Sequence, residues 1–197
     1  MMLPCIYWGN SVDLKALLAR YLRELNQPVI TDYDLSMALF RFHSSKKYRS
    51  EASDLSGPFP PWQEACTTFV QPLIDLGILC PHKDFPEGRV FTIIGNRYQE
   101  PGDIACSVDP FAYLSHLSAM EYHGLTNRLP KLLCISTPPP KEWSAFAAQK
   151  MEKDGRGLLT DELKGQLPRL VSLPFDKIHK TQITRYASIH RGAFKTV

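Results

Sequence analysis

The stretch LCPHKDFPEGRVFTIIG, residues 79–95, decides the fold that this sequence predicts for its first half. A short apolar run at residues 79–80 is followed by the tight turn FPEG at residues 85–88 and by a second run from Arg89 to Ile94. Two such runs on either side of a turn with proline and glycine are typical of a β-hairpin. We therefore predict a hairpin here.

Three helices are predicted before the hairpin. Residues 11–26 (SVDLKALLARYLRELN) place leucines at helical spacing, and a second helix begins at Thr31, which can cap it. Residues 53–63 (SDLSGPFPPWQ) are rich in proline, glycine and serine, which predicts a loop. The third helix is expected over residues 62–79, with Pro72 disturbing it and Gly77 ending it.

Three helices followed by a hairpin is the order of a winged helix–turn–helix domain, in which the third helix enters the major groove and the hairpin lies beside the backbone. We accordingly predict such a domain over residues 1–95. The pattern leaves one alternative open, because three helices can also simply pack against one another. Residues 96–109 are interpreted as a connector between two domains.

A small mixed α/β domain is predicted over residues 110–197, which makes the whole chain α+β. A helix is expected from Phe111 to His123, ended by Gly124, and a buried strand over residues 131–137. Another helix is expected over residues 141–154. Strands are expected at residues 169–175, 177–190 and 193–197, the middle one alternating threonine, isoleucine and tyrosine.

The composition is that of an ordinary globular protein: 197 residues, 44% hydrophobic and 22% charged. Five scattered cysteines without a CxxC pair favour reduced thiols and a cytoplasmic location. The N-terminus lacks a signal-peptide pattern, and no apolar stretch has the length of a membrane span, so we expect no membrane partner. GxSxG, P-loop and GxGxxG patterns are missing, which predicts no enzymatic activity and no cofactor.

Histidines do not form a recognisable metal or catalytic motif in the sequence. His116 and His123 lie on one predicted helix, about 10 Å apart along its axis, too far to chelate one ion. Ser115 and His123 are also too far apart for a nucleophile–base pair. Cys80 and His82 stand close together but lack a second ligand pair at zinc-finger spacing. We therefore predict no metal and no catalytic residue.

Charge is distributed unevenly along the chain. Residues 1–95 carry nine Lys and Arg against ten Asp and Glu, residues 96–149 carry four against five, and residues 150–197 carry ten against five. The first part nevertheless contains the dense cluster RFHSSKKYR, residues 41–49. We predict that Lys46, Lys47 and Arg49 hold DNA phosphates, with a solvated loop as the alternative.

The outward face of the third helix is the predicted base-reading surface. Gln63 and Gln71 can pair with adenine edges, and Thr67 and Thr68 can contact a thymine methyl group or a phosphate. From the hairpin, Lys83 and Arg89 are predicted to contact phosphates. Two acids on the same helix, Glu64 and Asp75, argue against a strongly cationic reader, so a plain solvated helix face stays an alternative.

The basic last quarter of the chain predicts a surface for an acidic partner. Its candidate residues are Lys177, Lys180, Arg185 and Arg191, with Lys195 further on. Alternating cations are equally typical of the solvated side of a sheet.

The run YLSHLSAMEYHGLTNRLP, residues 113–130, followed by KLLCIST, resembles the signature of AbiEi-type antitoxins, the regulator component of type IV toxin–antitoxin systems. The matching residues are Ser115, Ser118, Ala119, His123, Gly124, Leu125, Thr126 and Pro130. The resemblance implies a winged helix that binds the promoter of its own operon. It also implies a second domain that helps to neutralise a cognate nucleotidyltransferase-like toxin, a phage-defence function.

This sequence departs from that pattern in the long segment between the second and third helices, residues 44–61, which puts the docking geometry in doubt. Two functions of different class follow. The first is a non-enzymatic DNA-binding repressor and antitoxin. The second is a protein-interaction module whose winged helix docks a partner protein without binding DNA, which the near-neutral charge of residues 1–95 favours.

Overall fold

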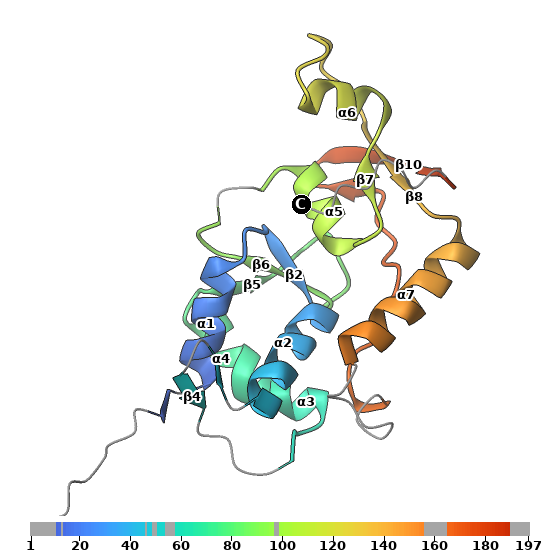
Figure 1. Cartoon of the computed structure of the whole chain (residues 1–197). Helices are drawn as coiled ribbons and strands as arrows, with labels where there is room; N and C mark the ends of the chain where they lie inside the picture. The colour runs from blue at the N-terminus through green and yellow to red at the C-terminus, as the bar shows by residue number, and fades with distance from the viewer. Residues whose placement is uncertain are drawn as a thin grey trace, which may run out of the picture.

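The protein is an α+β structure with two main sheets, described by a computed structural model (Figure 1). The structure describes residues 11–12, 14–45, 47–48, 51–53, 58–96, 99–155 and 165–189. Within this part of the chain no helix is long and apolar enough to cross a membrane.

The three predicted helices of the first half are confirmed. They are α1 (Leu14–Glu24), α2 (Asp32–Ser45) and a third segment made of α3 (Trp62–Ala65), the π-helical turn η1 (Cys66–Val70) and α4 (Gln71–Asp75). Pro72 stands in the first turn of α4, where its missing N–H costs least, so the helix changes its hydrogen-bond pattern before the proline.

The predicted hairpin is also confirmed. Strands β5 (Leu79–Pro81) and β6 (Val90–Ile93) pair antiparallel, and β6 pairs on its other side with β2 (Val29–Thr31), which gives the sheet order β2-β6-β5. Strand β2 was not predicted, because three buried residues are too few to show a sequence period. The sheet thus pairs β2, the strand just before α2, with β6, the second strand of the hairpin.

The segment between α2 and α3, expected to be a loop, contributes two strands to a further small sheet. Its strands β1 (Ser11–Val12), β4 (Glu51–Ser53) and β3 (Lys47–Tyr48) stand in the order β1-β4-β3. The pair β3 and β4 is antiparallel, so the long insertion folds back on itself beside the start of α1.

The described residues of the second half form a mixed sheet with helices beside it. Strands β7 (Tyr113–Leu114), β8 (Leu133–Thr137), β10 (Thr181–Ala187) and β9 (Lys177–Ile178) form a sheet in that order, with β8 and β10 parallel. The helices are α5 (Pro101–Val108), α6 (His116–Tyr122) and α7 (Pro140–Gly155). The predicted strand at residues 131–137 and helix at residues 141–154 are therefore confirmed.

Three predictions for the second half are wrong in their local structure. The expected connector, residues 96–109, contains α5, which buries Ile104, Ala105 and Val108. The expected helix from Phe111 to His123 is broken by β7, whose pairing with β8 outweighs helix propensity. Residues 169–175 form no strand, and residues 177–187 form two strands around a turn. The strand expected at residues 193–197 lies outside the described part of the chain.

Glycines end two helices as the sequence predicts. Gly77 and Gly124 adopt φ angles of +67° and +66°, the left-handed region that favours glycine. After Gly124, the Leu125 N–H donates to the Met120 carbonyl at 2.7 Å, and after Gly77 the Ile78 N–H donates to Leu73 at 2.8 Å. Both ends are Schellman caps, which satisfy carbonyls that the helix leaves free.

Both hydrophobic clusters draw on both halves of the chain. The larger one joins leucines of α1, α2 and α4 to Trp143 and Ala147 of α7. The smaller one joins Val29 and Phe85 of the first half to Ile135, Phe175 and Ile178 of the second. Helix α7 accordingly lies along the first half, and the hairpin turn lies beside β9 and β10 (Figure 1).

Candidate nucleic-acid interface

The helical segment 62–75 presents the predicted base-reading residues on its outer surface. Gln63, Thr67, Thr68 and Gln71 are all exposed, while the buried face of the segment consists of Ala65, Phe69, Val70 and Leu73. The Thr67 hydroxyl donates to the Gln63 carbonyl at 3.1 Å, and the Gln71 amide donates to the Asp75 carboxylate at 2.9 Å. The structure therefore brings these four side chains to one accessible surface.

This surface has no cation of its own. Residues 58–82 contain no lysine or arginine, and their charged residues are Glu64 and Asp75, both exposed. Phosphate attraction, which supplies most non-specific DNA affinity, must therefore come from neighbouring elements.

The predicted phosphate-binding cluster after α2 is described only in part. Lys46 and Arg49 lie outside the described residues, and of Lys47 the structure describes only its place in β3. Arg41, at the start of the same run, is exposed and pairs with Asp154 of α7 at 3.4 Å.

Arg89, a predicted phosphate contact, forms an ion pair inside the protein. Its Nη1 lies 2.6 Å from Oδ2 of Asp32, a buried carboxylate in the first turn of α2. Burial raises the pKa of Asp32 to about 6, and the Arg89 guanidinium opposes this rise. Arg89 therefore serves first as the counter-charge that joins the hairpin to α2.

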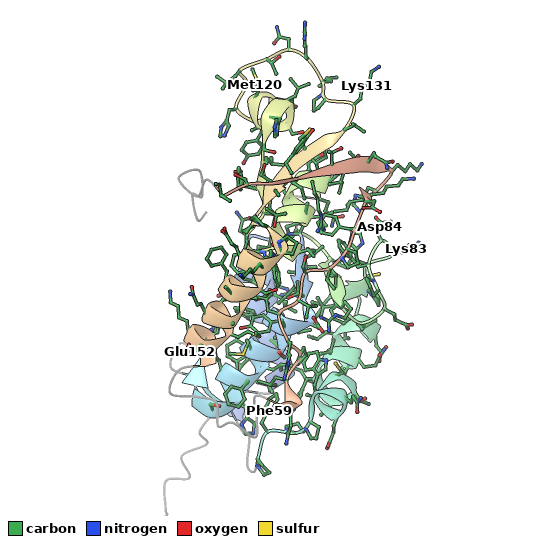
Figure 2. The ribbon with its side chains drawn as sticks, turned by 90° about the vertical axis from the view of Figure 1, so that its right-hand side faces the viewer. Phe59, Lys83, Asp84, Met120, Lys131 and Glu152 are labelled. Carbon is green, nitrogen blue, oxygen red and sulfur yellow. The ribbon has the colours of Figure 1, made fainter. Side chains whose placement is uncertain are left out.

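Lys83, the other predicted hairpin contact, is exposed at the turn between β5 and β6 (Figure 2). Its neighbours in the turn are packed against the second half. Phe85 is buried with its ring 5.4 Å from that of Phe175, and the His82 ring lies 5.3 Å from that of His179. If Lys83 contacts DNA, it does so from a turn whose position is held by its packing against residues 175–179.

The predicted partner-binding cations are not equivalent in the structure. Lys177 and Lys180 are exposed on the β9–β10 hairpin, whereas Arg191 and Lys195 lie outside the described residues. Arg185 is half-buried: its guanidinium lies 4.0 Å from the Phe175 ring, and its Nη2 donates to the Leu173 carbonyl at 2.8 Å. Burial lowers the pKa of Arg185, and its contacts make it a packing residue of the sheet.

Helix α6, which carries the antitoxin-like sequence, is fastened to β8 by a buried serine. Ser118 Oγ accepts a hydrogen bond from the Cys134 N–H at 2.9 Å, so this serine binds a neighbouring strand. Tyr122, in the last turn of α6, is 65% exposed. The helix begins at His116, later than the predicted start at Phe111.

Exposed apolar side chains gather at α6 and the loop after it. They are Met120, Tyr122, Leu125, Leu129 and Leu132. Figure 2 shows Met120 and Lys131 at the tip of a projection that stands away from the rest of the molecule. A surface of this kind is typical of a protein-interaction site.

No family model matches the chain, and no curated protein matches it significantly. The resemblance to antitoxins therefore stays a prediction, as does the assignment of the DNA-contacting residues. The described residues also contain one group of potential metal ligands, His82, Asp84 and His179, which the sequence did not predict. His179 is far from the other two along the chain, so no motif spacing could have revealed the group.

Proposed function

We propose that the chain is a non-enzymatic, DNA-binding transcriptional repressor and antitoxin of the AbiEi type, with a winged helix–turn–helix over residues 14–93. One observation carries the proposal: the order α1, β2, α2, the segment 62–75, β5 and β6, with the sheet order β2-β6-β5. This order supports a role for the segment 62–75 as recognition helix and for β5–β6 as wing.

In this mechanism the outer face of the segment 62–75 enters the major groove. Gln63 and Gln71 supply amides for adenine edges, and Thr67 and Thr68 supply methyl and hydroxyl groups. Lys46, Lys47 and Arg49 hold the phosphates beside the groove, and they offset the two acids of the helix.

The antitoxin part of the proposal rests on the resemblance of residues 113–130. It implies that the second half acts against a nucleotidyltransferase-like toxin from the same operon, in the cytoplasm. The exposed apolar tip of α6 supports a contact with a partner protein, because such side chains bury their surface only in a complex.

DNA binding is tested by fluorescence anisotropy with the DNA upstream of the gene, titrated with salt. Replacing Lys46, Lys47 and Arg49 by alanine should weaken binding to all sequences and lower the salt slope by about 0.9 per lost phosphate contact. The control replaces three exposed lysines of the second half, Lys131, Lys141 and Lys153, and should leave both values unchanged. If the two triple variants bind DNA equally well, Lys46, Lys47 and Arg49 do not belong to the DNA interface.

A second candidate function is a protein-interaction module without DNA binding. The lack of any cation in residues 58–82 and the hairpin turn packed against residues 175–179 favour it. This second function would be favoured if the folded wild-type chain does not bind DNA at low salt and co-purifies with the product of the neighbouring gene.

A further inference from the structure

Two histidines and an aspartate meet where the β5–β6 turn contacts the β9–β10 turn. His82 and Asp84 come from the first turn and His179 from the second, and one ligand atom of each lies within 4.8 Å of the others. The two imidazole rings are 5.3 Å apart between centroids and nearly parallel, at 7°. Figure 2 shows Asp84 at the edge of the molecule, beside the pale red strands of the second half.

The His82 side chain is held in place but is not fully satisfied. The residue is 7% exposed, and its Nδ1 accepts a hydrogen bond from the Asp84 N–H at 3.2 Å. Its Nε2 is buried and has no hydrogen-bond partner among the described residues. Because Nδ1 accepts this hydrogen bond, it carries the lone pair of the ring and Nε2 carries the proton, so a metal ion would bind at Nδ1 in place of the Asp84 N–H.

Asp84 joins the two turns even without an ion. Its Oδ2 accepts a hydrogen bond from the His179 N–H at 2.9 Å and lies 4.0 Å from Nδ1 of His82. The carboxylate therefore lies close to both histidine residues, and a hydrogen bond from the chain that carries the second ligand orients it.

The spacing fits a small divalent ion after minor side-chain rotation. Ligands bound tetrahedrally at about 2.0–2.1 Å lie about 3.4 Å from one another, so atoms within 4.8 Å need to approach by at most about 1.4 Å. Asp84 and His179 are exposed, so they are free to turn inward and leave room for water as a further ligand. Two imidazoles with one carboxylate suit zinc and its neighbours, whereas magnesium and calcium require mostly oxygen ligands.

We propose that His82, Asp84 and His179 bind one zinc-class divalent transition-metal ion, which fastens the β5–β6 turn to the β9–β10 turn. The ion would connect the two halves of the chain at a point where the hydrogen bond from the His179 N–H to Asp84 joins the turns. The proposal is independent of DNA binding, since it rests on the geometry of three side chains.

The test uses the full-length chain without an affinity tag, stripped of metal with a chelator and titrated with Zn²⁺ by calorimetry. We expect one equivalent to bind, and His179→Ala and Asp84→Asn to weaken it at least tenfold. Both residues are exposed, so the variants should fold, which circular dichroism checks. His123→Ala, a change at an exposed histidine outside the cluster, is the matched control and should bind as the wild type does.

Co²⁺ substitution separates this site from the cysteines. The expected adduct shows ligand-field bands of nitrogen and oxygen ligands and no thiolate charge-transfer band. The proposal is overturned if the wild-type chain binds no Zn²⁺, or if His179→Ala and Asp84→Asn bind Zn²⁺ as tightly as the wild type does. It is also overturned if Co²⁺ gives a thiolate band that these two variants do not change. In each case the three side chains form only a stacked, hydrogen-bonded contact between two turns.

Discussion

Asp32 shows how one residue can make stability depend on pH. Its carboxyl has a pKa of about 6 in the folded chain against 3.8 for the free group, because burial outweighs the Arg89 guanidinium. The folded state therefore binds more protons than the unfolded state between these two values, and the free energy of unfolding falls as pH rises through them. The contribution of Asp32 is complete below about pH 4 and is lost above about pH 6.

The variant Asp32→Asn cannot titrate, so its stability should not contain this contribution. We expect the wild type to lose up to about 3 kcal/mol relative to the variant between pH 4 and pH 7. Urea unfolding of both chains at several pH values measures the difference. A difference that stays constant with pH would show that the ion pair with Arg89 keeps Asp32 charged throughout.

Residue roles in this protein depend mainly on contacts that the sequence does not contain. Arg89 looks like a free cation of a hairpin until Asp32 is placed beside it, and His82 looks isolated until the β9–β10 turn brings His179 to it. Conversely, the exposure of Gln63 and Thr67 could be predicted, because helical spacing alone decides which face of an amphipathic helix points outward.

At the scale of elements, a buried hydrogen bond between Ser118 and β8 helps to hold α6 in place. In Ser118→Ala the Cys134 N–H loses its acceptor at 2.9 Å, and a buried unpaired donor costs about 1–3 kcal/mol. We expect a loss of this size in denaturant unfolding. Ser144→Ala, at an exposed serine of α7 that bonds only its own helix, should change the free energy by less than about 0.5 kcal/mol. Equal effects of the two changes would contradict the role of Ser118.

Helices, turns and strands that depend on neighbouring residues in the sequence could be predicted. Strands that depend on pairing with a distant segment could not. The α1 and α2 helices, the β5–β6 hairpin and the ends at Gly77 and Gly124 follow from periodicity and turn chemistry within a few residues. Strand β7 interrupts an expected helix because β8, a neighbour only in space, pairs with Tyr113 and Leu114. Strand β2 likewise exists because β6 offers it a partner.

The whole molecule is held together by the clusters that both halves share. Phe85 of the hairpin turn is buried against Phe175, and Val29 and Val90 belong to the same cluster as Ile135 and Ile178. On the opposite side, Trp143 of α7 packs in the cluster of α1 and α2. Separating the predicted domains at residues 96–109 would expose both clusters, so unfolding of one half should destabilise the other.

Phe85→Ala tests this coupling. Truncation of a buried phenylalanine should cost about 3–5 kcal/mol, and the loss should appear in both halves, because we expect the shared clusters to make the wild type unfold as one cooperative unit. Hydrogen exchange measured on peptides of α2 and of β8 would then show equal losses of protection. Leu129→Ala, at a residue that is 81% exposed, is the control and should leave both unchanged. Two separate transitions, with α2 unaffected by Phe85→Ala, would instead make residues 96–109 a true domain boundary, because only independent cores can lose stability one at a time.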